Sequence, residues 1–260
     1  FNTSAILGFV NVLEEILKTE SPSHIAVAFD PSGPTFRHEA YEEYKAQREA
    51  TPEDIKLSVP IIKQIVAAYN IPILEVPGFE ADDVIGTISK LAEQSDFNVY
   101  MLTPDKDYAQ LVSDKVFIYR PRHGGGYETL DVQGVKDKWG ISSPAQVIDL
   151  LDLMGDSSDN IPGCPGVGEK TAVKLLNDFN SIDNLLNSTD SLKGALKQKI
   201  IDNCEKIKFS KFLATIRTDV PIEFEPEKFI LASPNVVSLC EIFSELEFKS
   251  LLKKYSGRRP

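Results

Sequence analysis

Acidic side chains fall into four short groups along the chain, and their residue types suit a metal site. Aspartate and glutamate oxygens are the ligands that hard divalent cations such as Mg²⁺ and Mn²⁺ prefer. One group is a single aspartate, one is a Glu-x-Asp-Asp run, and two are aspartate pairs. They comprise Asp30; Glu80, Asp82 and Asp83; Asp105 and Asp107; and Asp156 and Asp159.

Each acidic group also has an ordinary explanation when it is taken alone. The chain holds 39 acidic residues, so close pairs arise by chance. The acids from Glu80 to Asp83 suit the positive end of a helix, and Asp105 suits a turn. Eight carboxylates that converged would raise one another's pKa values unless cations balanced them. An all-carboxylate site without histidine suits two-metal phosphodiester hydrolysis, so the groups together predict two Mg²⁺ or Mn²⁺ ions.

A glycine-rich loop follows the last acidic pair at once, in the sequence IPGCPGVGEKTA of residues 161–172. Glycines permit positive φ and a close approach to the backbone, and exposed amides at a helix start can receive phosphate oxygens. An ordinary corner between two helices is the alternative. The spacing is not that of a Walker loop, because Glu169 separates Gly168 from Lys170. The loop therefore predicts phosphate binding at the start of a helix over 169–179.

The elements that position these residues alternate between helix and strand up to about residue 131. Apolar residues recur at helical spacing over 4–17, 52–69 and 84–93. Short apolar runs predict strands over 24–29, 71–76, 98–103, 116–119 and 127–130. Such alternation predicts an α/β fold with a largely parallel sheet flanked by helices, and residues just past parallel strands share one rim.

After residue 131 the pattern is helical only. We therefore predict two domains, an α/β core over 1–130 and a helical subdomain over 131–260. The three cysteines are far apart in sequence and fit a reduced, cytosolic setting. No apolar run is long enough to predict a membrane span.

The net charge of −11 argues against a polyanionic partner, but the charge is unevenly distributed. Residues 193–217 contain seven Lys or Arg and two Asp or Glu, which makes this segment +5 and the rest −16. A solvated helical face is the ordinary interpretation of such a segment. A nucleic-acid partner would have to use this basic segment.

Four motifs in this order and spacing resemble one family closely. They are FDPSGPTFRHEAYEEYKAQR, VPGFEADDVI, TPDKD and GDSSDNIPGCPGVGEKTA. The chain resembles the 5′-nuclease domains of bacterial DNA polymerases I, which belong to the flap endonuclease superfamily with its PIN-like core. The resemblance covers essentially the whole chain. It implies a metal-dependent 5′-3′ exonuclease and flap endonuclease of DNA replication and repair, joined to polymerase modules in a bacterial cytoplasm.

The resemblance also assigns roles to residues. All eight acids named above would hold the two metals, directly or through water. Residues 37–50 would form the helical arch that admits a single strand. There Lys45 and Arg48 would contact the reacting phosphate, and Arg37, Tyr41 and Tyr44 would bind DNA. An exposed amphipathic helix is the ordinary alternative for this segment.

The loop near 161–172 would be the helix–three-turn–helix element that grips duplex DNA. Its contacts would come from Gly163, Gly166, Val167, Gly168, Lys170 and Thr171, and a monovalent cation such as K⁺ would bind its carbonyls. The substrates implied are DNA with 5′ flaps, nicks or branched duplex.

One departure from the family pattern concerns the start of the chain. Family members begin with a strand that carries another metal-binding aspartate, and Phe1 aligns after that strand. We therefore expect an incomplete sheet, with a gap lined by Val27, Phe29 and Met101 or their neighbours. A fragment that binds branched DNA without cutting it is the alternative function. A small-molecule phosphatase using Asp105 and Asp107 is less favoured, because it leaves the glycine loop without a role.

Overall fold

Three stretches that lie far apart in the sequence fold together into one unit, and the remaining chain forms a second. The structure, a computed structural model, describes residues 1–257. The first unit contains Phe1–Asp30, Glu49–Glu75 and the chain from Glu225 onward. The second contains Pro31–Arg48 and Val76–Phe224. The domain boundary predicted near residue 131 thus lies inside the second unit.

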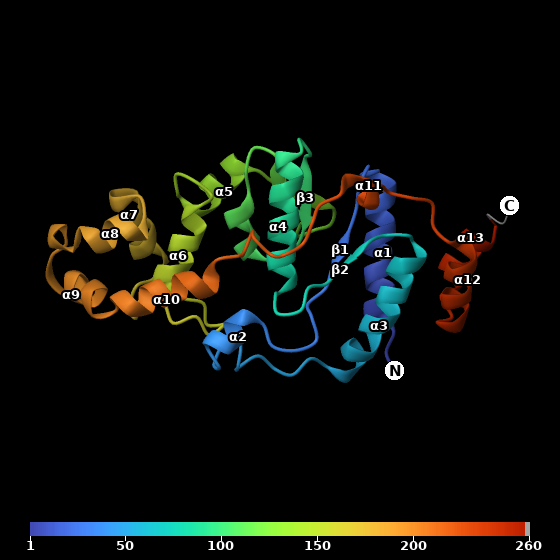
Figure 1. Cartoon of the computed structure of the whole chain (residues 1–260), viewed down its shortest axis with the longest axis horizontal. Helices are drawn as coiled ribbons and strands as arrows, with labels where there is room; N and C mark the ends of the chain where they lie inside the picture. Colours follow the sequence, from blue (N-terminus) through green and yellow to red (C-terminus); the bar gives the residue numbers. More distant parts are fainter. Residues whose placement is uncertain (258–260) are drawn as a thin grey trace. The chain divides into compact units, whose positions relative to one another are not determined.

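The helices of the first unit pack around one apolar core. Figure 1 shows α1 (Ser4–Thr19) and α3 (Glu53–Ala68) side by side, in blue and cyan. Apolar residues at helical spacing bury the inner face of α1, as the sequence predicts. The core also takes residues from α12 (Val236–Glu245) and α13 (Lys249–Ser256), after the short α11 (Pro226–Phe229). Its fully buried members are Ile6, Val10, Ile65, Val66, Leu239 and Phe243.

Two very short parallel strands complete the first unit. β1 (Val27–Ala28) pairs with β2 (Ile73–Leu74) in the register Val27 to Ile73 and Ala28 to Leu74. The sequence predicts longer strands here, over 24–29 and 71–76, whereas each observed strand has two residues and is half-buried. In its two-stranded sheet β1 has one hydrogen-bonded neighbour, so only one side of it is covered by another strand.

The second unit contains a three-stranded sheet in the order β3-β4-β5. β3 (Val99–Leu102) is parallel to β4 (Val116–Pro121), and β5 (Tyr127–Leu130) returns antiparallel to β4. α4 (Ala81–Gln94) precedes β3, and the 3₁₀ helix η1 (Lys106–Leu111) follows it. The predicted strands at 98–103, 116–119 and 127–130 are therefore confirmed.

The described residues form two separate small sheets, not one continuous sheet. In the second unit β3 is an edge strand, and its Tyr100 and Leu102 are 57% and 45% exposed. Met101, which we expected at a gap, is instead 3% exposed and packs into the core. Val27 and Phe29 pack partly buried against the core of the first unit. The neighbours of Met101 therefore form the open side of β3.

Beyond Asp131 the described part of the second unit is helical, as the sequence predicts. Figure 1 shows α6 (Gln146–Met154) and α10 (Cys204–Ala214) alongside each other. The other helices of this part are α5 (Val132–Trp139), α7 (Glu169–Phe179), α8 (Ile182–Asn187), η2 (Thr189–Ser191) and α9 (Gly194–Asp202). The short α2 (Phe36–Ala40) also belongs to the second unit. No helix within residues 1–257 combines the length and apolarity of a membrane span.

Candidate metal centre and nucleic-acid interface

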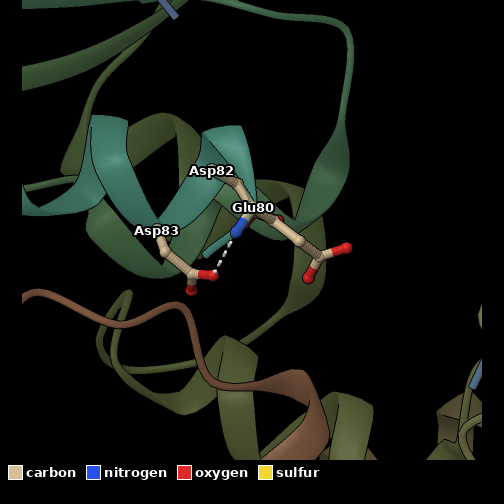
Figure 2. Close-up of side chains that lie close together, drawn as sticks. All are labelled: Glu80, Asp82 and Asp83. Carbon is tan, nitrogen blue, oxygen red and sulfur yellow. Dashed lines mark hydrogen bonds between the residues drawn. The ribbon is translucent and has the colours of Figure 1, made fainter. Parts of the chain in front are cut away.

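The first turn of α4 gathers three carboxylates. Glu80 is the N-cap, and Asp82 and Asp83 lie in the first turn, where the helix dipole favours negative charge. One carboxylate oxygen from each residue lies within 4.8 Å of the others. Figure 2 shows that the side chains of Glu80 and Asp83 point in different directions from this turn. Their partners differ accordingly.

Asp83 is buried, and both of its carboxylate oxygens accept hydrogen bonds within the protein. Its two oxygens accept from both terminal nitrogens of Arg37 at 2.8 and 2.9 Å. They also accept from the backbone N–H of Glu80 at 3.1 Å, the dashed line in Figure 2, and of Arg217 at 2.8 Å. These four bonds favour a positioning role for Asp83, and its predicted role as a direct metal ligand stays a prediction.

Arg37 lies inside the second unit, at 1% exposure, and not on a DNA-facing surface as we expected. Besides Asp83, it donates to Glu80 Oε2 at 2.5 Å and to the carbonyl oxygens of Leu213 and Thr215 at 2.8 and 2.7 Å. All five guanidinium N–H groups are thereby used. In this conformation Arg37 joins α2 to α4 and to the end of α10, and it has no donor left for DNA.

The other side of Glu80 carries Tyr44 and Lys45. Tyr44 donates its hydroxyl to Glu80 Oε2 at 3.1 Å, and the residue is 4% exposed, so it does not offer a free ring face to a base. Lys45 forms an ion pair with Glu80. Burial alone raises the pKa of Glu80, but the charges of Lys45 and Arg37 lower it below its ordinary value. Glu80 is therefore an ionised carboxylate between two cations.

The segment after α2 is a series of turns, not the continuous arch helix expected over 37–50. Lys45 has φ of +57°, which is uncommon for a residue with a side chain, and its N–H donates to the carbonyl of Asp159 at 3.0 Å. Arg48 pairs with the Asp159 carboxylate. Asn160 donates back to the carbonyl of Glu43 at 2.7 Å. These contacts fix Lys45 and Arg48 beside the acidic turn.

Tyr41, the last arch residue expected to bind DNA, lies half-buried beside the turns. Its hydroxyl donates to Glu43 at 3.0 Å, and its ring packs edge-on against Phe209 at 5.3 Å between centroids. Its role in DNA binding stays a prediction.

A second acidic group lies around η1 and the turn after α6. Asp105 caps η1, with its Oδ1 accepting from the N–H of Asp107 at 2.9 Å. Asp156 and Asp159 are 8% and 7% exposed, and Asp156 forms an ion pair with Lys106 at 2.9 Å. Sequence reasoning missed Lys106, although a single cation between two aspartates was a signal. Lys45, 3.9 Å from Asp159 Oδ2, links this group to Glu80.

Within these acidic groups, two carboxyl groups retain a buried oxygen with no hydrogen-bond partner among residues 1–257, and these suit a cation best. They are Asp82 and Asp107, through Oδ1 in each case. Burial, with Glu80 and Asp83 nearby, raises the pKa of Asp82 to about 8. Burial, with Asp105 nearby, raises the pKa of Asp107 to about 7. A buried carboxylate without a partner is costly, and a divalent ion with oxygen ligands would satisfy it, so these residues fit a metal.

Asp30 is the remaining predicted ligand, and it belongs to the first unit. It lies exposed, two residues after β1. Its role as a metal ligand stays a prediction.

The glycine loop divides into a buried part and an exposed part. Gly163 and Val167 are buried, so neither residue is accessible to DNA in this conformation. Gly163 has φ of +61°, and a Cβ there would lie 2.3 Å from the backbone of Gly155, so only glycine fits. Gly166, Gly168 and Lys170 are exposed, and Thr171 is half-buried. Gly168 has φ of −93° and open space around it, so its backbone does not require glycine, contrary to our expectation.

The basic segment adjoins this loop through α9. Lys199 reaches Gly166 so closely that a Cβ on the glycine would lie 2.7 Å from its Nζ. Within residues 1–257, Lys193, Lys199 and Lys206 form no ion pair, whereas Lys211 is engaged with Asp149 at 3.4 Å. The exposed glycines, the first turn of α7 and Lys199 thus lie together, and the first N–H groups of a helix have no partner within the helix. This arrangement suits a phosphate.

The fold and this site define a class of protein, an α/β and helical unit with an acidic centre beside a phosphate-suited loop. Family models match the chain over nearly its whole length. Residues 1–140 match the N-terminal resolvase-like domain of 5′-3′ exonucleases, and residues 142–236 match their C-terminal SAM fold. The chain belongs to the 5′-3′ exonuclease family.

Curated relatives and solved structures agree with this assignment. The chain is 42% identical over 255 residues to DNA polymerase I of Bacillus caldotenax, covering 97% of this chain and 29% of the relative. It is 43% identical to DNA polymerase I of Bacillus subtilis (strain 168), with the same coverage. The chain thus spans less than a third of the length of these relatives.

A bacteriophage T5 D15 flap endonuclease, solved as a pseudo-enzyme-product complex with DNA and metal ions, has the same fold. The TM-score is 0.69 at 20% identity, with 96% of this chain and 89% of that chain covered. At this identity the likeness concerns the fold alone.

Proposed function

We propose that this chain is a divalent-metal-dependent nuclease unit that acts as a 5′-3′ exonuclease and flap endonuclease on DNA. The observation that carries the proposal is the pair of buried carboxyl groups, Asp82 and Asp107, that each retain an unpartnered oxygen. Both belong to acidic groups that are otherwise hydrogen-bonded or ion-paired. The names of the relatives, DNA polymerases I, support DNA as the substrate.

We propose two cations, Mg²⁺ or Mn²⁺, held by carboxylates of the two acidic groups. Glu80 and Asp82 would hold one, and Asp105, Asp107, Asp156 and Asp159 the other, with Asp83 supporting Glu80 and Asp30 assigned by its motif. When bound, the cations would lower the pKa of a coordinated water and so supply hydroxide near neutral pH. Asp82 would release its proton on becoming a ligand, because metal ligands bind in their deprotonated form.

Lys45 and Arg48 would serve the reacting phosphate. In the structure the Lys45 and Arg48 side chains form ion pairs with two proposed metal ligands, Glu80 and Asp159 respectively. Each would lose part of that attraction once the carboxylate is shared with a metal. Lys45 would then offer its ammonium group to the charge that develops on the phosphate in the transition state.

The exposed part of the glycine loop would bind the phosphate backbone of duplex DNA beside the acidic centre. Gly166, Gly168, Lys170 and Thr171 would supply backbone and side-chain donors, and Lys199 would add charge. A monovalent cation such as K⁺ at the loop carbonyls is part of the same proposal and rests on the family resemblance.

The biological setting follows from the relatives. We propose that the unit is joined to polymerase modules, because the chain covers 29% of the two DNA polymerases I. Substrates with 5′ flaps, nicks or branches in replication and repair, and a place in the bacterial cytoplasm at the nucleoid, belong to this proposal.

The test is a cleavage assay on a 5′-flap duplex labelled at either end. In Mg²⁺ or Mn²⁺ we expect cutting at the flap junction, with 5′-phosphate and 3′-hydroxyl products, and no cutting in a chelator. A protein that binds the flap tightly but does not cut in either metal would be a binding unit, and the nuclease proposal would then be wrong for this chain.

A further inference from the structure

A basic cavity lies in the second unit, at the hairpin of β4 and β5. The cavity has a volume of about 500 Å³, and its lining includes Arg120, Arg122, His123, Glu128 and Lys138. Arg120 and Glu128 come from β4 and β5, Lys138 comes from α5, and Arg122 and His123 belong to the turn of the hairpin. Two arginines and a lysine therefore line the cavity together with one carboxylate, in a chain whose net charge is −11.

The cations of this cavity are only partly neutralised. Arg120 forms an ion pair with Glu128 at 2.6 Å. Among residues 1–257, neither the side chain of Arg122 nor that of Lys138 forms an ion pair, and Lys138 instead lies 4.5 Å from the ring centre of Trp139. Burial, together with Arg120, lowers the pKa of Lys138 below its ordinary value. An anion in the cavity would relieve this repulsion.

The size of the cavity indicates what kind of anion it suits. Ligand cavities in proteins range from about 300 to 1,000 Å³. A cavity of about 500 Å³ is too large for a lone phosphate ion and suits a phosphate together with its sugar. Pro104 also lines the cavity, and the next residue is Asp105 of the acidic centre, so the cavity adjoins the proposed site of cutting.

We propose that this cavity binds a sugar-phosphate unit of the DNA strand that the acidic centre acts on. The inference rests on the proposed function for the identity of the strand, and on the charges and the volume of the cavity for the phosphate. Arg122 and Lys138 bind the phosphate. Arg120, held in place by its ion pair with Glu128, lines the cavity. The contact is independent of the metals and of the glycine loop.

The test compares strand binding by the parent chain and by Arg122→Gln/Lys138→Gln. The probe is a fluorescent thymidine oligonucleotide with a 5′-phosphate, titrated in a chelator at several salt concentrations. Each phosphate contact in a single strand contributes about −0.7 to the slope of log K against log salt. We expect the double variant to bind about tenfold more weakly and to lose about 1.4 from that slope. Equal affinity and equal slope for the two proteins would overturn the proposal.

A charge-matched control is Lys56→Gln/Lys90→Gln, which removes two exposed lysines outside every site described above. It should retain the affinity and the salt slope of the parent. If it weakened binding as much as the cavity variant, the effect would be one of net charge, and the proposal would be wrong.

Trp139 can report on the cavity, because the Nζ of Lys138 lies 4.5 Å from its ring centre and it is the only tryptophan in the chain. Thymidine 5′-monophosphate should change its emission saturably in the parent, and much less in Arg122→Gln. The same nucleotide should compete with the oligonucleotide. Nucleotide binding that depends on Arg122, without any effect of the double variant on strand binding, would mean a site for free nucleotides and would overturn the strand assignment.

The outcome is separable from that of the proposed function. If the parent cuts flaps but the cavity variants bind strands normally, only the cavity proposal fails. If the cavity contrast in strand binding is found but the parent does not cut flaps, only the nuclease proposal fails.

Discussion

The two sides of the first turn of α4 hold carboxylates in opposite ways. On the inner side, Asp83 is 0% exposed and all its contacts are satisfied by Arg37 and two backbone N–H groups. On the outer side, Asp82 keeps a buried oxygen without a partner, and Glu80 turns toward the less buried Lys45. The same residue type is therefore a structural anchor in one position and a candidate ligand in the next. The number of satisfied oxygens decides which.

Asp82→Asn gives the largest expected effect on the outer side. In a chain that cuts flaps, we expect the rate in Mg²⁺ to fall about a thousandfold or more, or ~4 kcal/mol in the barrier. Flap binding in a chelator should be nearly unchanged, because the metal-free Asp82 carboxyl, whose pKa is raised to about 8, is already largely protonated near neutral pH. Single-turnover cleavage and binding in a chelator measure the two quantities. Cutting at the parental rate would show that Asp82 is not a metal ligand.

Arg37→Met gives the largest expected effect on the inner side, and there it concerns stability. The change leaves Asp83 buried without its cationic partner, and breaking such a pair costs about 3–5 kcal/mol. Denaturant unfolding followed by circular dichroism measures the loss. Asp83→Asn is the matched change, and it should also be strongly destabilising, because Arg37 then keeps its charge without a full partner. A stable Arg37→Met protein would mean that Arg37 is not the anchor.

Lys45→Ala tests the outer side of the α4 turn separately from the inner side. It should lower the cleavage rate while changing the free energy of unfolding little. Glu80 would keep Arg37 as its partner, so the free energy of unfolding should fall by only about 1 kcal/mol. The maximal cleavage rate should fall about a hundredfold, which corresponds to ~3 kcal/mol of transition-state stabilisation. Rates at saturating substrate, with Kd measured separately, test this. Lost affinity at an unchanged maximal rate would make Lys45 a substrate tether.

The sequence predicted the outer side of this comparison better than the inner side. Acids at the start of a helix, such as those of α4, are visible in the sequence as a local pattern. The start of another helix was predicted equally well, because the helix predicted over 169–179 coincides with α7. The Arg37 network was missed because two of its acceptors, the carbonyls of Leu213 and Thr215, lie more than 170 residues away. Sequence patterning places arginine on surfaces, and nothing local shows that this one is buried.

The short strands and the arch were missed for related reasons. Apolar runs predicted the positions of β1 and β2, but their length depends on how many neighbouring strands pair with them. The segment 41–48 has the composition of an amphipathic helix. Its backbone instead bonds to the turn that contains Asp159 and Asn160, more than 100 residues away, and tertiary contacts override local propensity.

Asp152 extends the comparison to α6, where a buried carboxyl group has no hydrogen-bond partner among residues 1–257. It is 0% exposed, and both its oxygens are unpartnered. Burial, with Asp149 nearby and Lys211 opposing, raises its pKa to about 9. Between pH ~4 and pH ~9 the folded state keeps a proton that the unfolded state releases, so stability falls as pH rises, by about 1.4 kcal/mol per unit.

Asp152→Asn should remove this pH dependence. We expect it to stabilise the protein at pH 8 by at least ~1 kcal/mol, and by less at pH 5, because the parent carboxyl is already protonated there in the fold. Thermal unfolding from pH 5 to 8 measures the difference. A gain in stability that is the same at both pH values would show that the carboxyl group is ionised in the fold.

The smallest expected effect comes from the glycine loop. Its two exposed glycines, Gly166 and Gly168, differ in backbone conformation and in the space around them. Gly166 has φ of +79°, so an alanine there is strained by about 1–2 kcal/mol, and its methyl group would displace Lys199. Gly168→Ala meets neither cost, because φ is −93° and the space around it is open. We expect Gly166→Ala to weaken duplex binding severalfold in a chelator, and Gly168→Ala to bind as the parent does. Anisotropy with a blunt duplex measures both. If Gly168→Ala weakened binding as much as Gly166→Ala, the duplex would contact the loop at the α7 start itself, and Lys199 would have no special part in holding the phosphate.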